Sequence, residues 1–370
     1  MSKFKVGIIG CGNISSIYFT NLKRFHMLEV VACADLNLER AKEQAALYGV
    51  PKACGADELL ADPDIDIVLN LTIPAAHADI HLRALEAGKH SYGEKPLALN
   101  LEDGKRILSL AREKGLAVGC APDTFLGGSL QTCRKLIDDR WIGEPIGATA
   151  FMMSEGPESW HPNPGFLYQK GAGPLFDMGP YYLTALVHLL GPIRRVSGST
   201  RITYPERMIT NDYHYGDKIQ VQTPTHTAGL LDFHSGAVCT MITSFDVWGS
   251  KLPHIEIYGT HGTMIVPDPN DFGGPILVKR HDWPEFKEIP MVYGFTGNHR
   301  GLGLLDMAHG IASKQSHRAN GELAYHVLEA MHGFEISSNE GRHYDVASTC
   351  AQPEPLPMDG YRFSTKTRVD

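Results

Sequence analysis

Lys95 has the residue type and the setting to stabilise negative charge during oxidation of a carbinol. That reaction needs a base for the hydroxyl proton and a cation against the developing alkoxide. Lys95 follows a short strand pattern near residues 90–92, at the end of a predicted parallel sheet where ligands collect. Pro96 favours an extended backbone at Lys95 and so limits where the ammonium can lie. A solvated surface position is the alternative for any lysine.

A predicted helix at about 180–190 supplies two further candidates. Its leucines and valine share one face, and it ends at a Gly-Pro pair. Continued backwards, the same periodicity predicts a polar face that would form one wall of a cleft. An N-cap is the alternative role for Asp177, because a proline lies in the first turn, and the two roles are compatible. The polar face comprises Asp177, Tyr181, Thr184 and His188. Lys95, Asp177 and Tyr181 are the candidate catalytic residues.

The proton acceptor stays open between two side chains. A tyrosine has a usual pKa of about 10, so Tyr181 needs a nearby cation such as Lys95 to act as a base near neutral pH. His161 is the rival. It lies in the rigid, aromatic stretch 159–164, which would suit stacking against a sugar face or merely pack as a proline-rich loop. The predicted substrate contacts are Asp123, Trp160, His161, Asp177 and Tyr181, although Asp123 could equally begin a turn.

A glycine-rich turn near the N-terminus predicts a dinucleotide site. Gly10 permits a tight turn after a buried strand, and Gly12 lets the backbone approach a pyrophosphate, while Ser15 replaces the usual third glycine. The following helix offers unpaired N–H groups to that anion. Asp35 ends the second strand, where a carboxylate hydrogen-bonds a ribose 2′-hydroxyl. Since this carboxylate would repel a 2′-phosphate, NAD is predicted over NADP.

The hydrophobic pattern changes along the chain. From residue 4 to about 120, short β-branched runs alternate with amphipathic helical stretches, which predicts a parallel sheet with right-handed crossovers. Between residues 147 and 258, alternating segments predict an antiparallel sheet with one face on a core. The expected fold class is α/β, with a Rossmann NAD-binding domain at 1–122 and a second α/β domain at 123–370.

Four motifs in chain order resemble the glucose–fructose oxidoreductase/inositol dehydrogenase/MocA family, and the resemblance covers nearly the whole chain. They are the Gly10–Gly12 turn, TIPAAH at 72–77, GEKPL at 93–97 and GAGPLFDMGPY at 171–181. The resemblance implies NAD(P)-dependent oxidation or reduction of a sugar-like carbinol. It also implies a second domain that binds substrate and whose large, open, mostly antiparallel sheet supports a homo-oligomer, a dimer or tetramer. The family's commonest pattern has histidine where this chain has Tyr181.

The residues expected to bind the cofactor come from the glycine turn, the second strand and two of these motifs. A structural role is the alternative for His77, because a histidine that begins a helix often only supports the fold. The full set is Gly10, Cys11, Gly12, Asn13, Ile14, Asp35, Thr72, His77, Glu94 and Lys95.

No catalytic metal is predicted. The spacings of His214, His226 and His234 match no standard ligand pattern, and a polar sheet face explains them. The seven cysteines are scattered and include no CxxC pair, which favours a reducing compartment over a disulfide framework.

Composition narrows the class of partner. A net charge of −8 leaves no basic excess for nucleic acid or an anionic membrane. The sequence has no apolar stretch long enough to span a bilayer and no signal-peptide pattern, so a cytoplasmic location is expected.

The leading functional expectation is an NAD-dependent oxidoreductase that acts on the CH–OH group of a sugar, glycoside or cyclitol. A second hypothesis retains NAD and uses transient oxidation to achieve glycoside elimination or hydrolysis. A third is a non-catalytic NAD-sensing regulator, against which the presence of Lys95, Asp177 and Tyr181 counts. No charged cluster marks a phosphate or carboxylate on the substrate, so a neutral polyol is preferred.

Overall fold

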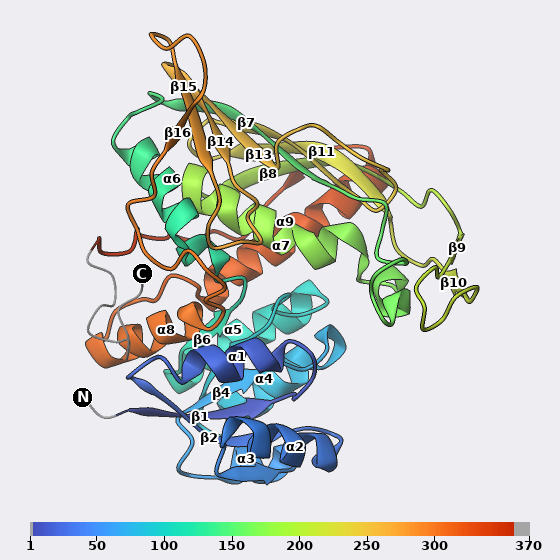
Figure 1. Ribbon diagram of the computed structural model, residues 1–370, viewed down its shortest axis with the longest axis vertical. Helices are drawn as coiled ribbons and strands as arrows, with labels where there is room; N and C mark the ends of the chain where they lie inside the picture. The colour runs from blue at the N-terminus through green and yellow to red at the C-terminus, as the bar shows by residue number, and fades with distance from the viewer. Residues whose placement is uncertain (1–2, 359–370) are drawn as a thin grey trace. The chain divides into compact units, whose positions relative to one another are not determined.

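Six strands form one parallel sheet in the order β3-β2-β1-β4-β5-β6 (Figure 1). The computed structural model describes residues 3–358. All four residues of β4 are buried, as expected for a parallel strand covered on both faces. The order reverses between β1 and β4, and ligands bind such sheets at the carboxyl ends beside this reversal. The strands are β1 (Phe4–Ile9), β2 (Leu28–Ala34), β3 (Lys52–Cys54), β4 (Ile67–Asn70), β5 (His90–Gly93) and β6 (Val118–Cys120).

Helices connect these strands, and their ends follow local sequence signals. Asn37 and Asn100 cap α2 and α5 by accepting backbone N–H groups of the first turn. Both helices end at glycines, Gly49 and Gly115. The helices are α1 (Ser15–Leu22), α2 (Leu38–Tyr48), α3 (Ala56–Ala61), α4 (His77–Glu86) and α5 (Leu101–Lys114), with a 3-10 turn η1 (Pro74–Ala76) before α4.

A late part of the chain returns to this sheet. The N–H of Cys120 donates to the carbonyl of Ala319 at 3.1 Å, and Gly119 forms a bridge with Asn320. Among the described residues, the first compact unit therefore comprises 3–128, 292–325 with α8 (Leu302–Ser313), and 353–358. This division differs from the continuous domains 1–122 and 123–370 expected from the sequence, because strand β6 is completed by backbone from beyond residue 300.

The second unit is built on nine strands in the order β16-β15-β14-β13-β7-β12-β11-β8-β17. Neighbouring strands pair antiparallel except β7 and β12, which are parallel. The α/β fold predicted from the sequence, with its mostly antiparallel second sheet, is confirmed. The strands are β7 (Pro145–Met153), β8 (Ile193–Arg201), β11 (His226–Phe233), β12 (Val238–Ser244), β13 (Ile255–Gly259), β14 (Gly262–Val266), β15 (Ile276–Arg280), β16 (Lys287–Ile289) and β17 (Tyr344–Asp345).

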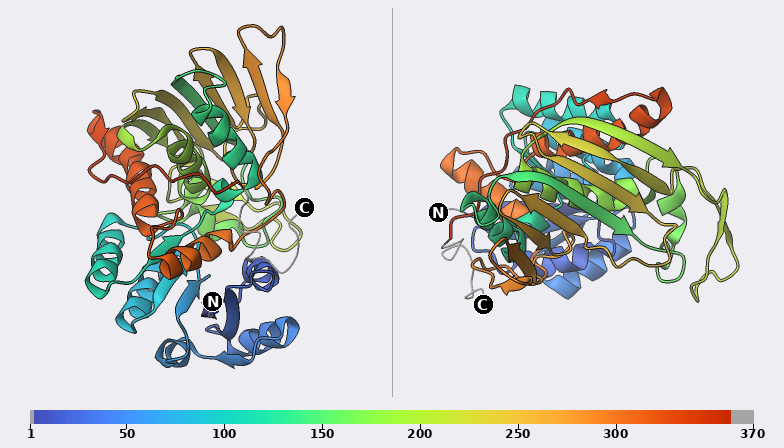
Figure 2. Two further views of the ribbon diagram at one scale, coloured as in Figure 1. Left: turned by 90° about the vertical axis from the view of Figure 1, so that its left-hand side faces the viewer. Right: turned by 90° about the horizontal axis from the view of Figure 1, so that it is seen from above.

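Helices α6 (Gly128–Asp138), α7 (Gly173–Leu190) and α9 (Gly321–Glu340) lie against one face of this sheet (Figures 1 and 2). Alternate residues of β11 and β12 are buried, which matches a sheet with one face on a core. Gly198 and Gly229 are paired across β8 and β11, and a Cβ at either position would lie within 2.7 Å of Phe334. The two glycines therefore allow α9 to approach the sheet closely.

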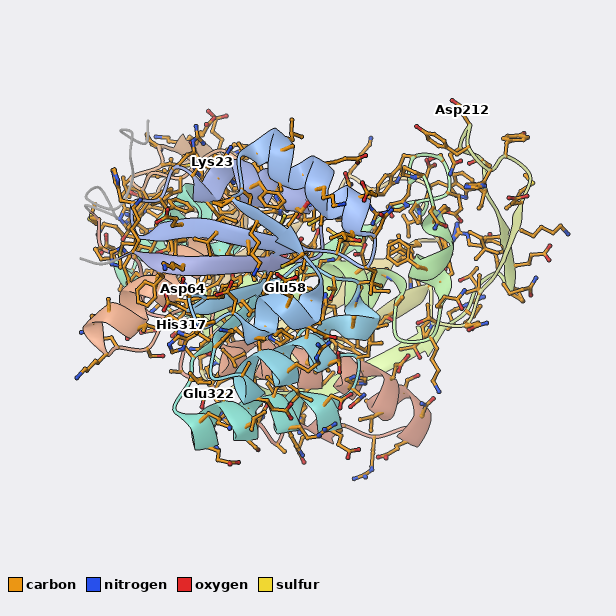
Figure 3. All side chains as sticks on the ribbon, turned by 90° about the horizontal axis from the view of Figure 1, so that it is seen from below. Lys23, Glu58, Asp64, Asp212, His317 and Glu322 are labelled. Atoms are coloured by element: carbon orange, nitrogen blue, oxygen red, sulfur yellow. The ribbon has the colours of Figure 1, made fainter. Side chains whose placement is uncertain are left out.

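A short hairpin projects from this unit. It consists of β9 (Glu206–Met208) and β10 (Lys218–Gln220), which pair antiparallel. Asp212, in the turn between them, lies at the outer end of the hairpin (Figure 3). A 3-10 helix, η3 (Pro164–Tyr168), lies beside the hairpin and leads into α7.

Candidate functional site

The glycine turn after β1 has the conformation that a bound pyrophosphate requires. Gly10 has φ +102°, and a Cβ there would lie 2.5 Å from the Leu71 carbonyl, so only glycine fits. A Cβ on Gly12 would meet nothing within 4 Å, which leaves open space above the turn. The Ser15 hydroxyl donates to the Gly12 carbonyl at 2.6 Å. Ser15 therefore braces the turn from the first residue of α1, where the third glycine usually lies.

Asp35 is fixed beside this turn. Its Oδ2 accepts the N–H of Cys11 at 2.9 Å, and its Oδ1 accepts that of Asn37 at 2.8 Å. A carboxylate has about four lone-pair sites, so two remain for ribose hydroxyls. Arg40 lies 3.6 Å from Oδ1 and is half exposed. Sequence reasoning missed Arg40, which places a cation next to the carboxylate that is predicted to contact the ribose.

Apolar side chains are exposed at the carboxyl ends of neighbouring strands. Leu36 and Leu38 follow β2, Ile14 follows the glycine turn, and Ile73 follows β4; all four are exposed. Because β2 and β4 flank β1, these side chains come from adjacent strand ends. Exposed apolar groups of this kind suit the flat faces of an adenine. Together with Gly10, Gly12 and Asp35, they fit a dinucleotide.

His77 braces two backbone segments near these strand ends. The residue is 1% exposed, and its Nδ1 and Nε2 lie 2.6 Å and 3.0 Å from the carbonyl oxygens of Pro96 and Thr72. Burial lowers the pKa of His77, so the neutral ring has one N–H, and we expect it on the shorter contact to Pro96. Asn70 holds the same turn through its bonds to Thr72 and to the His77 carbonyl. This role differs from the cofactor contact predicted for His77.

Glu94 and Lys95 follow β5 at the same edge of the sheet. The Tyr18 hydroxyl donates to Glu94 Oε1 at 2.7 Å, and the Lys95 N–H donates to Glu94 Oε2 at 3.1 Å. Burial, followed by the charge of Glu94, raises the pKa of Tyr18 well above its ordinary value, so the hydroxyl keeps its proton and remains a donor. Glu94 is buried and Lys95 is half-buried. Glu94 therefore fixes the backbone that presents Lys95.

Asp123 is buried rather than presented to a ligand. It is 1% exposed, and its Oδ2 accepts the N–H groups of Gly301 and Gly303 at 2.8 Å and 2.9 Å. The carboxylate thus anchors the start of α8. Its other oxygen, Oδ1, has no hydrogen-bond partner. The substrate contact predicted for Asp123 conflicts with this burial.

Helix α7 begins earlier than the sequence pattern indicates. Ala172 is the N-cap, and Pro174 lies in the first turn, so Asp177 is inside the helix and the N-cap prediction for it is wrong. Pro180, which has no N–H, also lies inside the helix. Thr184 and His188 are buried, so the predicted polar face is not exposed along its length. Asp177 is half-buried and Tyr181, one turn later, is 8% exposed.

The aromatic stretch before α7 keeps its rings at the surface. Trp160 and Phe166 are exposed, and the His161 ring lies between them. The N–H of Asn163 donates to His161 Nδ1 at 3.0 Å, so the neutral imidazole carries its proton on Nε2. In this tautomer His161 would donate a hydrogen bond through Nε2 rather than accept a proton there.

The histidines considered as metal ligands contact different partners. His214 pairs with Asp217 at 3.5 Å, and His226 contacts the Ser244 hydroxyl at 2.9 Å. Across residues 3–358, no group of three or more His, Cys, Asp or Glu side chains is arranged to hold a metal ion. The same part of the chain contains no helix with the length and hydropathy to cross a bilayer.

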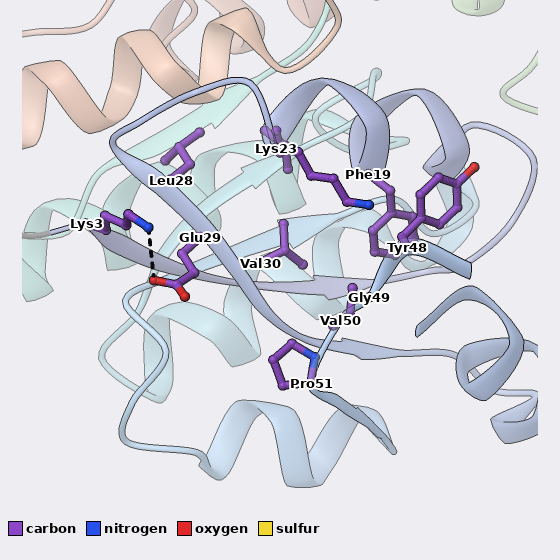
Figure 4. Close-up of a pocket in the computed structure, with 11 residues that line it drawn as sticks. Lys3, Phe19, Lys23, Leu28, Glu29, Val30, Tyr48, Gly49, Val50 and Pro51 are labelled. Atoms are coloured by element: carbon purple, nitrogen blue, oxygen red, sulfur yellow. Dashed lines mark ion pairs between the residues drawn. The ribbon is translucent and has the colours of Figure 1, made fainter. Parts of the chain in front are cut away.

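A pocket in the first unit lies away from the candidate site. It has a volume of about 210 Å³ and is lined by the start of β2, the end of α1 and residues 48–51 (Figure 4). Phe19 and Tyr48 stack at 4.9 Å there, and Lys23 lies 5.3 Å from the Tyr48 ring. The pocket borders the amino end of β2, whereas Asp35 and Leu36 follow its carboxyl end.

Comparison with known proteins decides the family. A model described as the oxidoreductase family with an NAD-binding Rossmann fold matches residues 4–121, and a model of the GFO/IDH/MocA C-terminal domain matches residues 130–265. A 1,5-anhydro-D-fructose reductase from Ensifer adhaerens is 34% identical over 275 residues, which cover 70% of this chain and 74% of the reductase. The chain belongs to the Gfo/Idh/MocA family. It is therefore an NAD-binding oxidoreductase, and the predicted family, enzyme class and cofactor are confirmed.

Two further relatives agree. A myo-inositol 2-dehydrogenase from Thermotoga maritima is 24% identical over 262 residues, with 70% of this chain and 74% of that enzyme covered. The solved structure of a levoglucosan dehydrogenase in complex with NADH superposes with a TM-score of 0.80 at 21% identity, covering 94% of this chain and all of the other. At that identity, the superposition supports the fold alone.

The buried carboxyl group of Asp123 predicts a pH-dependent stability. Burial raises its pKa from 3.8 to about 6. Between these values the folded protein binds more protons than the unfolded chain, so the free energy of unfolding falls as pH rises through this window. Relative to Asp123→Asn, the wild type should lose about 2 kcal/mol from pH ~4 to pH ~6. Urea unfolding at several pH values tests this, and parallel curves for the two proteins would contradict it.

Proposed function

We propose that this Gfo/Idh/MocA oxidoreductase transfers a hydride between NAD and the carbinol carbon of a sugar, glycoside or cyclitol. The observation that carries the proposal is the fixed presentation of Lys95 by Glu94, at the same sheet edge as the glycine turn and Asp35. The related 1,5-anhydro-D-fructose reductase and myo-inositol 2-dehydrogenase support a polyol substrate. The bound cofactor supplies the hydride acceptor.

The residues of this chain have distinct roles in the proposal. Lys95 stabilises the alkoxide that forms as the substrate hydroxyl loses its proton, and the C–H electron pair then leaves the carbinol carbon as a hydride. Tyr181 accepts the hydroxyl proton, and Asp177, one turn earlier on α7, orients the substrate hydroxyl. Tyr181 is preferred over His161 as the base, because His161 Nδ1 already accepts a hydrogen bond from Asn163.

The cofactor roles divide between direct contacts and support. We assign Asp35 to the ribose of NAD and assign His77 and Glu94 to positioning the strand ends. We assign direct contacts to Gly10, Cys11, Gly12, Asn13, Ile14, Asp35 and Thr72. A homo-oligomer is also proposed, since Leu230 and Val238 are exposed apolar residues on paired strands of the large sheet. Light scattering after gel filtration gives the subunit number.

Turnover with NAD tests the function. We expect multiple-turnover NADH formation with members of a panel of cyclitols, monosaccharides and glycosides. Lys95→Met should lower kcat/KM by roughly 10²–10³, because a charge contact to the transition state is lost. Release of a cleaved glycoside without net NADH would instead support a retained cofactor and would overturn the proposal.

A comparison of three variants identifies the base. Tyr181→Phe should lower kcat by roughly 10²–10⁴ and remove the ascending limb of its pH profile. Tyr182→Phe is the matched control, since it removes the neighbouring hydroxyl, which contacts His254 at 2.8 Å. If His161→Gln removes the limb and Tyr181→Phe keeps it, His161 is the base.

The contacts of Asp35 predict its effect on cofactor choice. Asp35→Ser should raise the ratio of kcat/KM for NADP to kcat/KM for NAD by on the order of tenfold or more. The variant removes the carboxylate that would repel a 2′-phosphate, whereas the Arg40 cation remains beside the site. Glu39→Ser removes an exposed acid from α2, the helix that carries Arg40, and serves as the charge-matched control. An unchanged preference in Asp35→Ser would show that Asp35 does not select the ribose.

A further inference from the structure

Three rings of the segment 157–168 form a continuous aromatic strip. Trp160 is 69% exposed and Phe166 is 47% exposed. The His161 ring lies between them, with centroid distances of 5.5 Å and 5.4 Å and interplanar angles of 68° and 64°. Exposed rings that touch one another at the surface are characteristic of a binding surface rather than a core.

The backbone under the strip is held by the turn of the β9–β10 hairpin. The carbonyl of Glu158 accepts the N–H groups of Thr210 and Asn211 at 3.1 Å and 3.0 Å. The Asn211 side chain, itself buried, donates to the carbonyl of His161 at 2.7 Å. The exposed rings therefore stand on a fixed support, which reduces the entropy lost when a ligand binds.

Buried ion pairs anchor the same segment from below. The Glu158 carboxylate pairs with Arg207, which also binds Asp246 at 2.9 Å. The guanidinium lies 5.5 Å from the centre of the Tyr168 ring. Asp246 in turn accepts the Thr225 hydroxyl at 2.7 Å. Both ends of the segment are thus tied to the sheet and the hairpin.

The chemistry of the segment selects the ligand class. Glu158, buried and paired, is the only carboxylate in 157–168, and the segment has no lysine or arginine. A single-stranded nucleic acid would need a basic groove beside the rings. The nearby turn carries Asp212 (Figure 3) and also Asp217 instead. Neutral rings with amide and imidazole groups between them match the apolar C–H face and the hydroxyls of a sugar.

The strip is too open to be the place of the reacting ring. Tyr181, the proposed base, is 8% exposed, whereas Trp160 is 69% exposed. Both belong to one braced piece of chain, because η3 packs on α7 and the Thr223 hydroxyl donates to the Ala172 carbonyl at 3.1 Å. A substrate part bound on the strip stays partly in solvent, unlike a carbinol held at Tyr181.

We propose that Trp160, His161 and Phe166 form a subsite for a second ring of the substrate, a sugar unit or a cyclic aglycone joined to the sugar that is oxidised. The preferred substrates are then glycosides or disaccharides rather than free monosaccharides or cyclitols. This inference rests on the proposed function, and it adds the size and shape of the substrate.

Steady-state kinetics with matched substrates tests the subsite. The wild type should turn over a phenyl glycoside and a disaccharide with kcat/KM about tenfold above that of the parent monosaccharide, as one aromatic stacking contact provides. Trp160→Ala should remove most of this advantage through KM rather than kcat, and Trp160→Phe should restore part of it. Trp283→Ala removes a tryptophan from the β15–β16 turn and should leave all the ratios unchanged.

Two results would overturn the inference. One is a wild type without preference for the two-ring substrates, and the other is an equal loss for all substrates in Trp160→Ala. Fluorescence titration with phenyl glycoside in the absence of NAD separates this inference from the proposed function. Quenching that requires Trp160, in a protein that oxidises no sugar, would keep the subsite and reject the proposed reaction.

Discussion

A buried hydrogen bond of 2.7 Å from the Tyr18 hydroxyl to Glu94 joins the two chemical elements of the first unit. Tyr18 belongs to the helix that follows the glycine turn, and Glu94 fixes the backbone of Lys95. A carboxylate excluded from water is stable only when donors surround it, so Glu94 cannot be released from either partner without a free-energy cost. The turn that fits the cofactor and the lysine proposed for catalysis are thereby held in one register.

In the second unit, ion pairs rather than a tyrosine–carboxylate bond fix the position of a functional segment. Its ion pairs between Arg207, Glu158 and Asp246 are buried, and such pairs often contribute little net stability compared with apolar packing. These ion pairs matter for geometry rather than for net stability, because each directional bond fixes one position of the loop. A neutral, rigid aromatic surface results, next to the helix that carries Asp177 and Tyr181.

Local sequence signals predicted the parts of the site that depend on local geometry. Gly10 and Asp35 could be assigned because a strand, a tight turn and a following strand place them within about 25 residues of one another. Helix α7 was predicted only from about residue 180, since the glycines and prolines of 173–180 conceal its first two turns. Long-range partners could not be found this way. The donors to Asp123 lie 178 and 180 residues further along the chain, and Tyr18 is 76 residues from Glu94.

The first unit can be completed during synthesis only after residues 292–325 have been made, because these residues return to its sheet. While residues 129–291 are being made on the ribosome, the Cys120 N–H has no Ala319 carbonyl and the Asp123 carboxylate has no Gly301 or Gly303 donors. The outer backbone edge of β6 in the nascent dinucleotide unit therefore stays unpaired until most of the chain has left the exit tunnel. A chain that ended at residue 128 would contain every motif of the cofactor turn, but it would lack the backbone that completes the domain.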